Sequence, residues 1–331
     1  MKLMENTLNP YSGNLFLDFF YTLITRLFLF ATGQLSLNQL ASDEIQMIVL
    51  IEISAAAALI GCFLVLRKMT MLANSLSHTI LIGIVGAFFL SHTFFSSGKI
   101  AEDISINLHV MLLAAFIMGI VTVFLTEFLT KTLKMQEDAS TGIIFTTLFA
   151  AGIILVTVLT RNAHIGTEVV MGNVDALHLE DSYLAGLILI IDLIVLWLFF
   201  KEFKITTFDP NLSHALGISP TIFNYLLMTL VSITIIGAFR AVGVLMVLSF
   251  ITGPPLTARL LTARLKVMLA LAVGMGILAS LIGVAVSRHV LSAYDIALST
   301  GGIVVCITAL FFICALFYTN SRSSRIIREQ N

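Results

Sequence analysis

Apolar runs about as long as a bilayer is thick recur along almost the whole of this chain. Hydrocarbon about 30 Å thick needs roughly 20 apolar residues per spanning helix. Inside the hydrocarbon, only α-helices and closed β-barrels pair all of their backbone N–H and C=O groups with one another. Of the 331 residues, 58% are hydrophobic and 11% are charged, unlike an ordinary soluble domain. The sequence predicts an all-α, polytopic membrane protein with eight hydrophobic segments, at about 46–66, 72–91, 108–130, 140–160, 183–203, 222–250, 266–287 and 297–319.

The sixth segment, 222–250, is longer than one membrane crossing needs. It contains Gly237, Arg240 and Gly243, which favour a break into two shorter helices around a turn. A broken segment leaves one side of the membrane and returns to that same side.

The placement of Lys and Arg predicts the orientation, because short loops rich in these residues remain in the cytoplasm. If the sixth segment is broken, most of the 18 basic residues fall on one side. An unbroken sixth helix would leave the cluster around Arg259 outside. The residues on the predicted cytoplasmic side are Arg67, Lys68, Lys131, Lys134, Lys201, Lys204, Arg259, Arg264, Lys266, Arg322, Arg325 and Arg328.

The chain divides into one membrane domain with two short flanking pieces. Residues 1–45 form an N-terminal extension whose apolar run 15–32 is interrupted by Asp18 and Arg26, so it predicts an interfacial helix or a weak extra span. Residues 46–319 form the transmembrane domain, and 320–331 form a basic cytoplasmic tail. The net charge of −1 gives no indication of a nucleic-acid partner.

The three cysteines predict no metal knuckle and no disulfide framework. Cys62, Cys306 and Cys314 all lie in apolar runs, and none forms a CxxC pair. We expect them to be small buried thiols.

His78 lies inside the second hydrophobic segment, where an ionisable residue is costly and is a functional-site hypothesis. Asn74 precedes it by four residues, so a helix places both on one face. Imidazole suits zinc, manganese and iron, whereas an amide is a weak neutral ligand. The alternative is a structural histidine that is hydrogen-bonded to a neighbouring helix.

Asp192 lies near the centre of the fifth segment, where a charged carboxylate costs about 2.5 to 3.5 kcal/mol even on insertion scales. It requires a partner or water. One interpretation is a structural bond to another helix, and the other is a role in the passage of a cation.

The stretch from Gly253 to Arg264 carries two adjacent prolines, which disfavour an unbroken helix. We therefore predict a short cytoplasmic helix from Pro255 to Arg264 that lies along the membrane, with an ordinary basic loop as the alternative. A second cytoplasmic stretch, 208–220, has the cap signals of another short helix that also faces a partner. Its His214 is expected to be a surface residue.

The motifs of several enzyme classes do not occur in the sequence. The chain has no GxxxxGK[ST] phosphate loop, so any ATP must be hydrolysed by another subunit. It also lacks HExxH and GxSxG. Ser75 and His78, three apart on one helix, are poorly placed for a nucleophile and its base. The sequence predicts a transport protein and not an enzyme.

Several fragments together, in order over about 46–319, resemble the membrane permeases of the bacterial zinc, manganese and iron ABC importers. The resemblance depends on the spacing of many short motifs and not on one of them. The fragments are Leu66-Arg67-Lys68-Met69, Asn74-Ser75-Leu76-Ser77-His78 with Gly83, Thr141-Gly142-Ile143-Ile144-Phe145, Met171-Gly172-Asn173-Val174, Phe208-Asp209-Pro210, Ala215-Leu216-Gly217, and Ala241-Val242-Gly243-Val244-Leu245-Met246-Val247 leading to Pro255, Thr257, Ala258 and Arg259.

The resemblance implies a multi-pass permease of the bacterial inner membrane that moves a divalent transition metal by alternating access. The metal is the transported substrate and not a resident cofactor. The implied partners are a cytoplasmic ATPase dimer, an extracytoplasmic metal-binding protein and a second permease, identical or paralogous. His78, Asn74 and Asp192 are the candidate metal-path residues, and Pro255, Thr257, Ala258, Arg259 and Arg264 are the candidate coupling residues.

The sequence departs from the family pattern at two positions. The family motif usually has Asp where this chain has Asn74, which removes an anionic ligand. At 295–301 the proline expected before the small residue and glycine is absent. Two alternatives stay open at this point: a permease for a metal chelate or corrinoid, and an ion-coupled secondary transporter.

Overall fold

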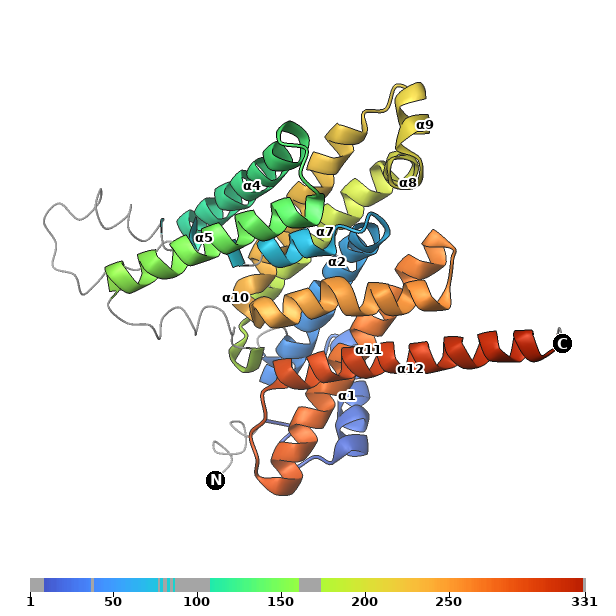
Figure 1. Cartoon of the computed structure of the whole chain (residues 1–331). Helices are drawn as coiled ribbons and strands as arrows, with labels where there is room; N and C mark the ends of the chain where they lie inside the picture. The colour runs from blue at the N-terminus through green and yellow to red at the C-terminus, as the bar shows by residue number, and fades with distance from the viewer. Residues whose placement is uncertain are drawn as a thin grey trace, which may run out of the picture.

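The chain is helical throughout the part described by the computed structural model (Figure 1). No strand occurs among these residues, which are 9–36, 39–76, 78–79, 82–83, 86, 108–160 and 174–329. The helices are α1 (Phe16–Ala31), α2 (Ser42–Leu66), α4 (Leu108–Thr132), α5 (Glu137–Thr160), η3 (Val174–Ala176), α7 (Leu179–Leu198), α8 (Phe200–Phe208), α9 (Pro210–Ala215), α10 (Pro220–Leu261), α11 (Leu265–Tyr294) and α12 (Thr300–Glu329).

Seven helices in the described ranges are long and apolar enough to cross a membrane. They confirm the all-α, multi-pass prediction. The predicted span 183–203 ends too late, because the helix breaks at Phe199 and α7 stops at Leu198. The predicted boundary between membrane domain and tail falls inside α12, which continues to Glu329. Of the predicted span 72–91, only 72–76, 78–79, 82–83 and 86 lie among the described residues.

The predicted break in the sixth segment is confirmed at Gly243. Its backbone, with φ 76° and ψ 167°, is non-helical and interrupts α10. This region of φ and ψ is essentially restricted to glycine. Two candidate spans, Pro220–Phe239 and Ala241–Leu261, lie on either side of Arg240, three residues before this break, and the gold and orange halves of α10 diverge in Figure 1. Gly237 has a different role, because a Cβ there would lie 1.9 Å from Cδ1 of Ile188.

The separate helix predicted to start at Pro255 does not form. Instead, α10 continues through Pro254 and Pro255 to Leu261, so this prediction was wrong. Pro255 cannot donate a hydrogen bond to the carbonyl of Ile251, yet that oxygen points at Gly61 of α2, where a Cβ would lie only 2.1 Å away. In membranes, such a proline is tolerated when a neighbouring helix accommodates the freed carbonyl.

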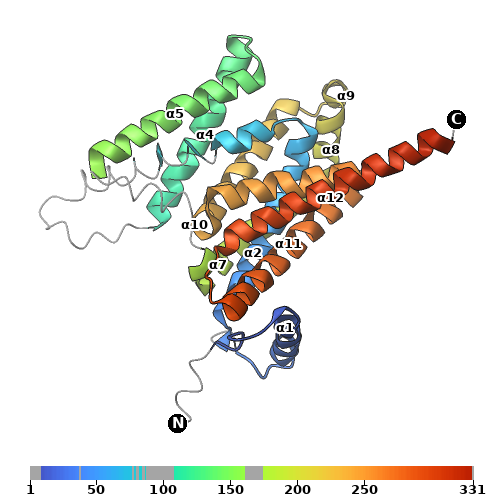
Figure 2. The same cartoon turned by 60° about the horizontal axis from the view of Figure 1, so that its bottom comes forward.

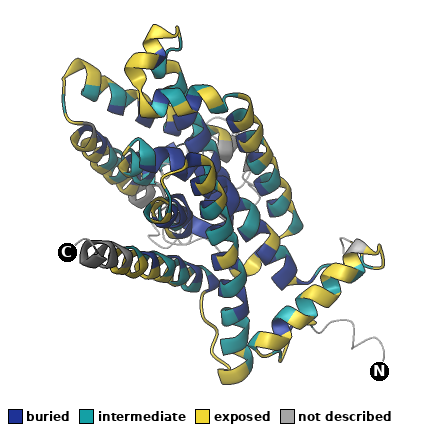
Figure 3. Cartoon of the chain, turned by 90° about the vertical axis from the view of Figure 1, so that its right-hand side faces the viewer, coloured by how far each residue is buried: buried dark blue, intermediate teal, exposed yellow. Residues whose placement is uncertain are grey.

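Helix α2 forms the centre of the bundle and is buried along most of its length (Figure 3). It contacts α7, α10 and α11. By contrast, α5 and α12 expose large apolar side chains, as expected for surfaces that face lipid. Figure 2 shows α12 extending beyond the bundle and α1 lying at its edge, beside α11. Cys62 is buried as predicted, but Cys306 and Cys314 are exposed on α12.

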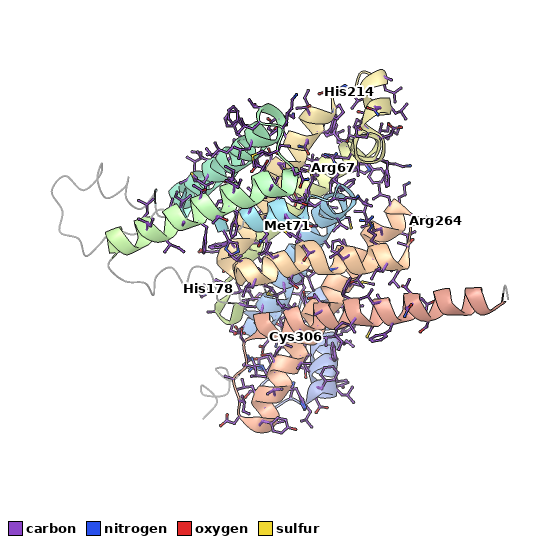
Figure 4. The ribbon with its side chains drawn as sticks, in the orientation of Figure 1. Arg67, Met71, His178, His214, Arg264 and Cys306 are labelled. Carbon is purple, nitrogen blue, oxygen red and sulfur yellow. The ribbon has the colours of Figure 1, made fainter. Side chains whose placement is uncertain are left out.

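The helix directions place the basic clusters at one end of the bundle. Arg67 follows the last residue of α2, and Arg264 precedes α11. In Figure 4, Arg67, His214 and Arg264 lie toward the upper right, whereas His178 lies on the other side of the molecule. The excess of Lys and Arg predicts that the first end faces the cytoplasm, and it is called the cytoplasmic end below.

The contact between Gly61 and Ile251 predicts a destabilising substitution. We expect Gly61→Ala to lower the melting temperature, because its Cβ would collide with a backbone oxygen at 2.1 Å and α2 would have to move away from α10. Overpacking of this kind typically costs about 1–3 kcal/mol. Gly274→Ala in α11 is the control, since no heavy atom lies within 4 Å of its Cβ position. Thermal unfolding in detergent measures both, and equal melting temperatures would contradict this packing.

Candidate functional site

The segment around His78 has a buried face and a half-exposed face. Asn74 and His78 lie on the half-exposed face. Thr79 is buried and accepts a hydrogen bond from the Thr122 hydroxyl of α4 at 2.9 Å. The other buried members of this segment are Leu72, Ala73, Ser75 and Leu76. Asn74 and His78 are therefore both partly accessible, and Thr79 fixes the buried side of this segment against α4.

Two aromatic rings of α5 flank the His78 imidazole. The ring centroids of Phe145 and Phe149 each lie 5.2 Å from that of His78, with interplanar angles of 52° and 65°. The two phenyl rings stack on each other at 5.7 Å. Phe145 and Phe149 are four residues apart, so one face of α5 presents both. This spacing is visible in the sequence, but nothing in the sequence indicated that the pair would meet His78.

The metal-binding capacity of this face is small. No group of three His, Cys, Asp or Glu residues that could hold a metal occurs in the described ranges. His78 and Asn74 supply at most one imidazole and one neutral amide, both of which are weak alone.

Asp192 is bonded to a neighbouring helix, as the structural interpretation expects. Its side chain is 0% exposed, and Oδ2 accepts a hydrogen bond from the Thr234 hydroxyl of α10 at 2.8 Å. Oδ1 has no hydrogen-bond partner among the described atoms. The bond joins α7 to α10, whereas His78 contacts α5, so the two candidate residues lie on different helix pairs.

Arg67 joins three elements at the cytoplasmic end. Its guanidinium donates to Thr206 at 2.8 Å, to Thr207 at 3.0 Å and to Asn224 at 3.3 Å. All three acceptors are neutral, and burial lowers the pKa of Arg67 to about 10. The side chain nevertheless remains charged at neutral pH, and it connects the end of α2 to α8 and α10.

The candidate coupling residues separate into buried and exposed groups. Pro255, Thr257 and Ala258 are buried, and Ala258 packs with Ala58, Cys62, Val65, Met268 and Ala272. Arg259 donates to the carbonyl of Val65 at 3.1 Å, and the same oxygen also accepts from the Lys68 amide in the turn that follows α2. Arg264 is exposed. Only the two arginines therefore present side chains to the cytoplasm.

A groove of about 570 Å³ lies between α8 and the turn that joins α10 to α11. Apolar side chains from both elements line it, and three basic residues are among its walls. The lining residues are Phe200, Lys204, Phe208, Ala263, Arg264, Leu265, Lys266 and Val267. Beyond it, α9 exposes Leu212, Leu216 and His214, the last as predicted. This groove and α9 together are termed the cytoplasmic surface below.

Known proteins resemble this chain in sequence and fold. A protein-family model described as the ABC 3 transport family matches residues 44–319. A Chlamydia trachomatis protein named "Probable metal transport system membrane protein" is 38% identical over 327 residues, covering 99% of each chain. The Bacillus subtilis protein named manganese transport system membrane protein MntD is 34% identical, covering 70% of this chain and 78% of that one.

A solved structure has a similar arrangement of helices. It is described as PsaBC from Streptococcus pneumoniae in complex with Fab, and it has a TM-score of 0.66 and 26% sequence identity. The match covers 82% of this chain and 89% of the other.

Two substitutions at Asp192 separate a structural bond from a role in cation passage. We expect Asp192→Asn to keep the melting temperature and transport, because an amide oxygen can still accept from Thr234. Asp192→Leu should lower the melting temperature, since an unpaired buried hydroxyl costs about 1–3 kcal/mol. Thermal unfolding and transport assays on both variants check this. If Asp192→Asn folds normally but fails to transport, Asp192 belongs to the cation path.

Proposed function

This chain belongs to the ABC 3 transport family, and from that premise we propose that it is the membrane permease of an importer for a divalent transition metal. The family match over residues 44–319 carries the proposal, because it spans the whole transmembrane body. Relatives named for metal transport over matching lengths support the choice of cargo. ATP would be hydrolysed by a separate subunit, since the sequence has no phosphate-binding loop.

In this proposal, His78 and Asn74 contribute to the metal path. An imidazole inside a spanning segment is costly unless it faces protein or a wet path, and His78 lies on a half-exposed face. The remaining ligands would come from a second permease across the path. Ligands of this kind serve manganese, zinc and iron, so the proposal covers all three metals. Weak binding suits a path that must release its cargo.

The proposed ATPase contact is the cytoplasmic surface. It combines exposed apolar side chains with Lys204, Arg264 and Lys266, which suits a partner with an apolar contact and acidic rim. Pro255, Thr257 and Ala258 are buried and would act by transmitting movement, because Pro255 lies beside Gly61 of α2 and Ala258 packs against α2 and α11. An extracytoplasmic metal-binding protein would deliver the cargo at the opposite end. Nothing in the proposal requires nucleic acid.

The role of His78 is tested by uptake in vesicles that contain the permeases, the ATPase and the binding protein. We expect His78→Ala to abolish accumulation of manganese, zinc or iron, because the face would lose the one imidazole that its described residues supply. Assembly with the ATPase should be unchanged. His289→Ala is the matched control, since His289 is also half-buried in a spanning helix.

Three results would count against the proposal. Normal metal uptake by His78→Ala would remove the residue from the path. Uptake by the unmodified protein that persists without ATP and follows an ion gradient would identify a secondary transporter. ATPase activity that responds to a metal chelate or corrinoid and not to free ions would assign a different cargo.

The cytoplasmic surface is tested by charge reversal at its exposed edge. We expect Arg264→Glu combined with Lys204→Glu to reduce co-purification of the ATPase and to make the residual association less sensitive to salt, because favourable charge pairs are lost. The control Lys134→Glu changes a cytoplasmic lysine outside the groove. Unchanged association and uptake in the double variant would exclude this surface as the contact.

A further inference from the structure

The N-terminal helix α1 lies outside the matched family region, which begins at residue 44. One of its faces is packed against the protein. Phe19 and Tyr11 are buried, and their ring centroids lie 4.9 Å apart. Phe16 and Phe20 pack beside them. The helix also contacts α11.

Polar bonds fasten this segment to the start of α2. The Tyr11 hydroxyl donates to Oε1 of Glu44 at 2.9 Å, and Arg26 forms an ion pair with the same carboxylate. Burial and the neighbouring Glu44 raise the pKa of Tyr11, so it stays a donor at neutral pH. These contacts fix α1 relative to the start of α2.

Asp43 of α2 connects the N-terminal segment to α11. It accepts a hydrogen bond from Asn9 at 2.7 Å and forms an ion pair with Arg288. Residues of the N-terminal segment, α2 and α11 thus meet at the extracytoplasmic end of the bundle. Because these contacts fix α1, the face of α1 that does not pack on the protein points in one direction relative to the bundle.

The free face of α1 is an apolar stripe. Leu17, Tyr21, Ile24 and Phe28 are 78%, 76%, 66% and 68% exposed. Their spacing of four, three and four residues keeps them within about 60° of one another around the helix. The charged residues of α1 lie elsewhere, with Arg26 on the packed side and Asp18 roughly 100° from Leu17.

The length and place of α1 argue against a spanning helix. Its 16 residues extend about 24 Å, which is shorter than the hydrocarbon thickness of about 30 Å. Figures 2 and 3 show it projecting from the bundle near the start of α2, away from the α8–α9 end.

We propose that α1 is an amphipathic anchor that lies in the extracytoplasmic leaflet of the bilayer. Leu17, Tyr21, Ile24 and Phe28 enter the boundary between headgroups and acyl chains, while Asp18 and Thr25 stay toward water. The stripe has no charged rim of the kind that water-soluble partners use, and it is rich in the aromatic and aliphatic residues of interfacial helices. Because it carries no basic cluster, binding requires no anionic lipid.

The experiment compares tryptophans at two adjacent positions of α1. Trp197, the only tryptophan, is first changed to Phe. Ile24→Trp and Thr25→Trp are then introduced separately into the full chain in vesicles of brominated phosphatidylcholine. Both positions are exposed, but they point about 100° apart. We expect bromine to quench Ile24→Trp at least about twofold more strongly than Thr25→Trp, and acrylamide to show the opposite order.

Two outcomes would overturn the anchor. Equal quenching by acrylamide with little effect of bromine would place the stripe in water. Protection from both quenchers that increases with protein density would assign the stripe to a second copy of the chain. If Ile24→Trp does not fold, Phe28→Trp takes its place, because it lies on the same stripe. Replacing phosphatidylcholine partly by phosphatidylglycerol should leave the result unchanged.

Discussion

The close contact of α2 with α10 determines the form of the membrane domain. The Ile251 carbonyl cannot receive a hydrogen bond from Pro255, and only a residue without a Cβ can lie against it, which Gly61 does. This contact allows α10 to continue to Leu261 and so to bring Arg259 to the carbonyl of Val65. The same end of α2 holds Arg67, whose three hydrogen bonds connect it to α8 and α10. The cytoplasmic surface is therefore connected to the central helix through α8 and Arg67.

Local sequence signals predicted the helices well and their ends less well. Apolar runs of about 20 residues are sufficient to identify spans, because hydrocarbon permits little else. The break in the sixth segment was predicted among Gly237, Arg240 and Gly243, and the structure places it at Gly243. The prediction at Pro255 was wrong, because the rules for proline describe the hydrogen bond that its own helix loses. They do not describe how a neighbouring helix can accommodate the carbonyl that this loss leaves free. That accommodation depends on Gly61, which is far away in the sequence. The early end of α7 at Phe199 likewise has no clear signal in an apolar run.

The sequence predicted only part of the candidate site, because local spacing is visible in a sequence and the contacts between distant helices are not. The spacing of Asn74 and His78 predicts a shared face, because helical geometry alone decides it. The contacts of that face with Phe145 and Phe149, and the bond between Asp192 and Thr234, depend on which helices are neighbours. Among the coupling residues, the sequence could not separate the buried Thr257 and Ala258 from the exposed Arg264. Burial is a property of the assembled bundle, and here α2 and α11 supply it.

In the proposed importer, each permease contributes weak ligands to a metal site that the two permeases share. A metal held tightly by one chain would be hard to release, and a neutral Asn74 in place of a carboxylate avoids such a trap. If each permease offers an imidazole and an amide, the affinity depends on how close the two faces lie. A change in the distance between the subunits then changes the affinity directly, so that closure binds the ion and opening releases it. ATP-driven movement can drive transport in this way because binding differs between the two conformations.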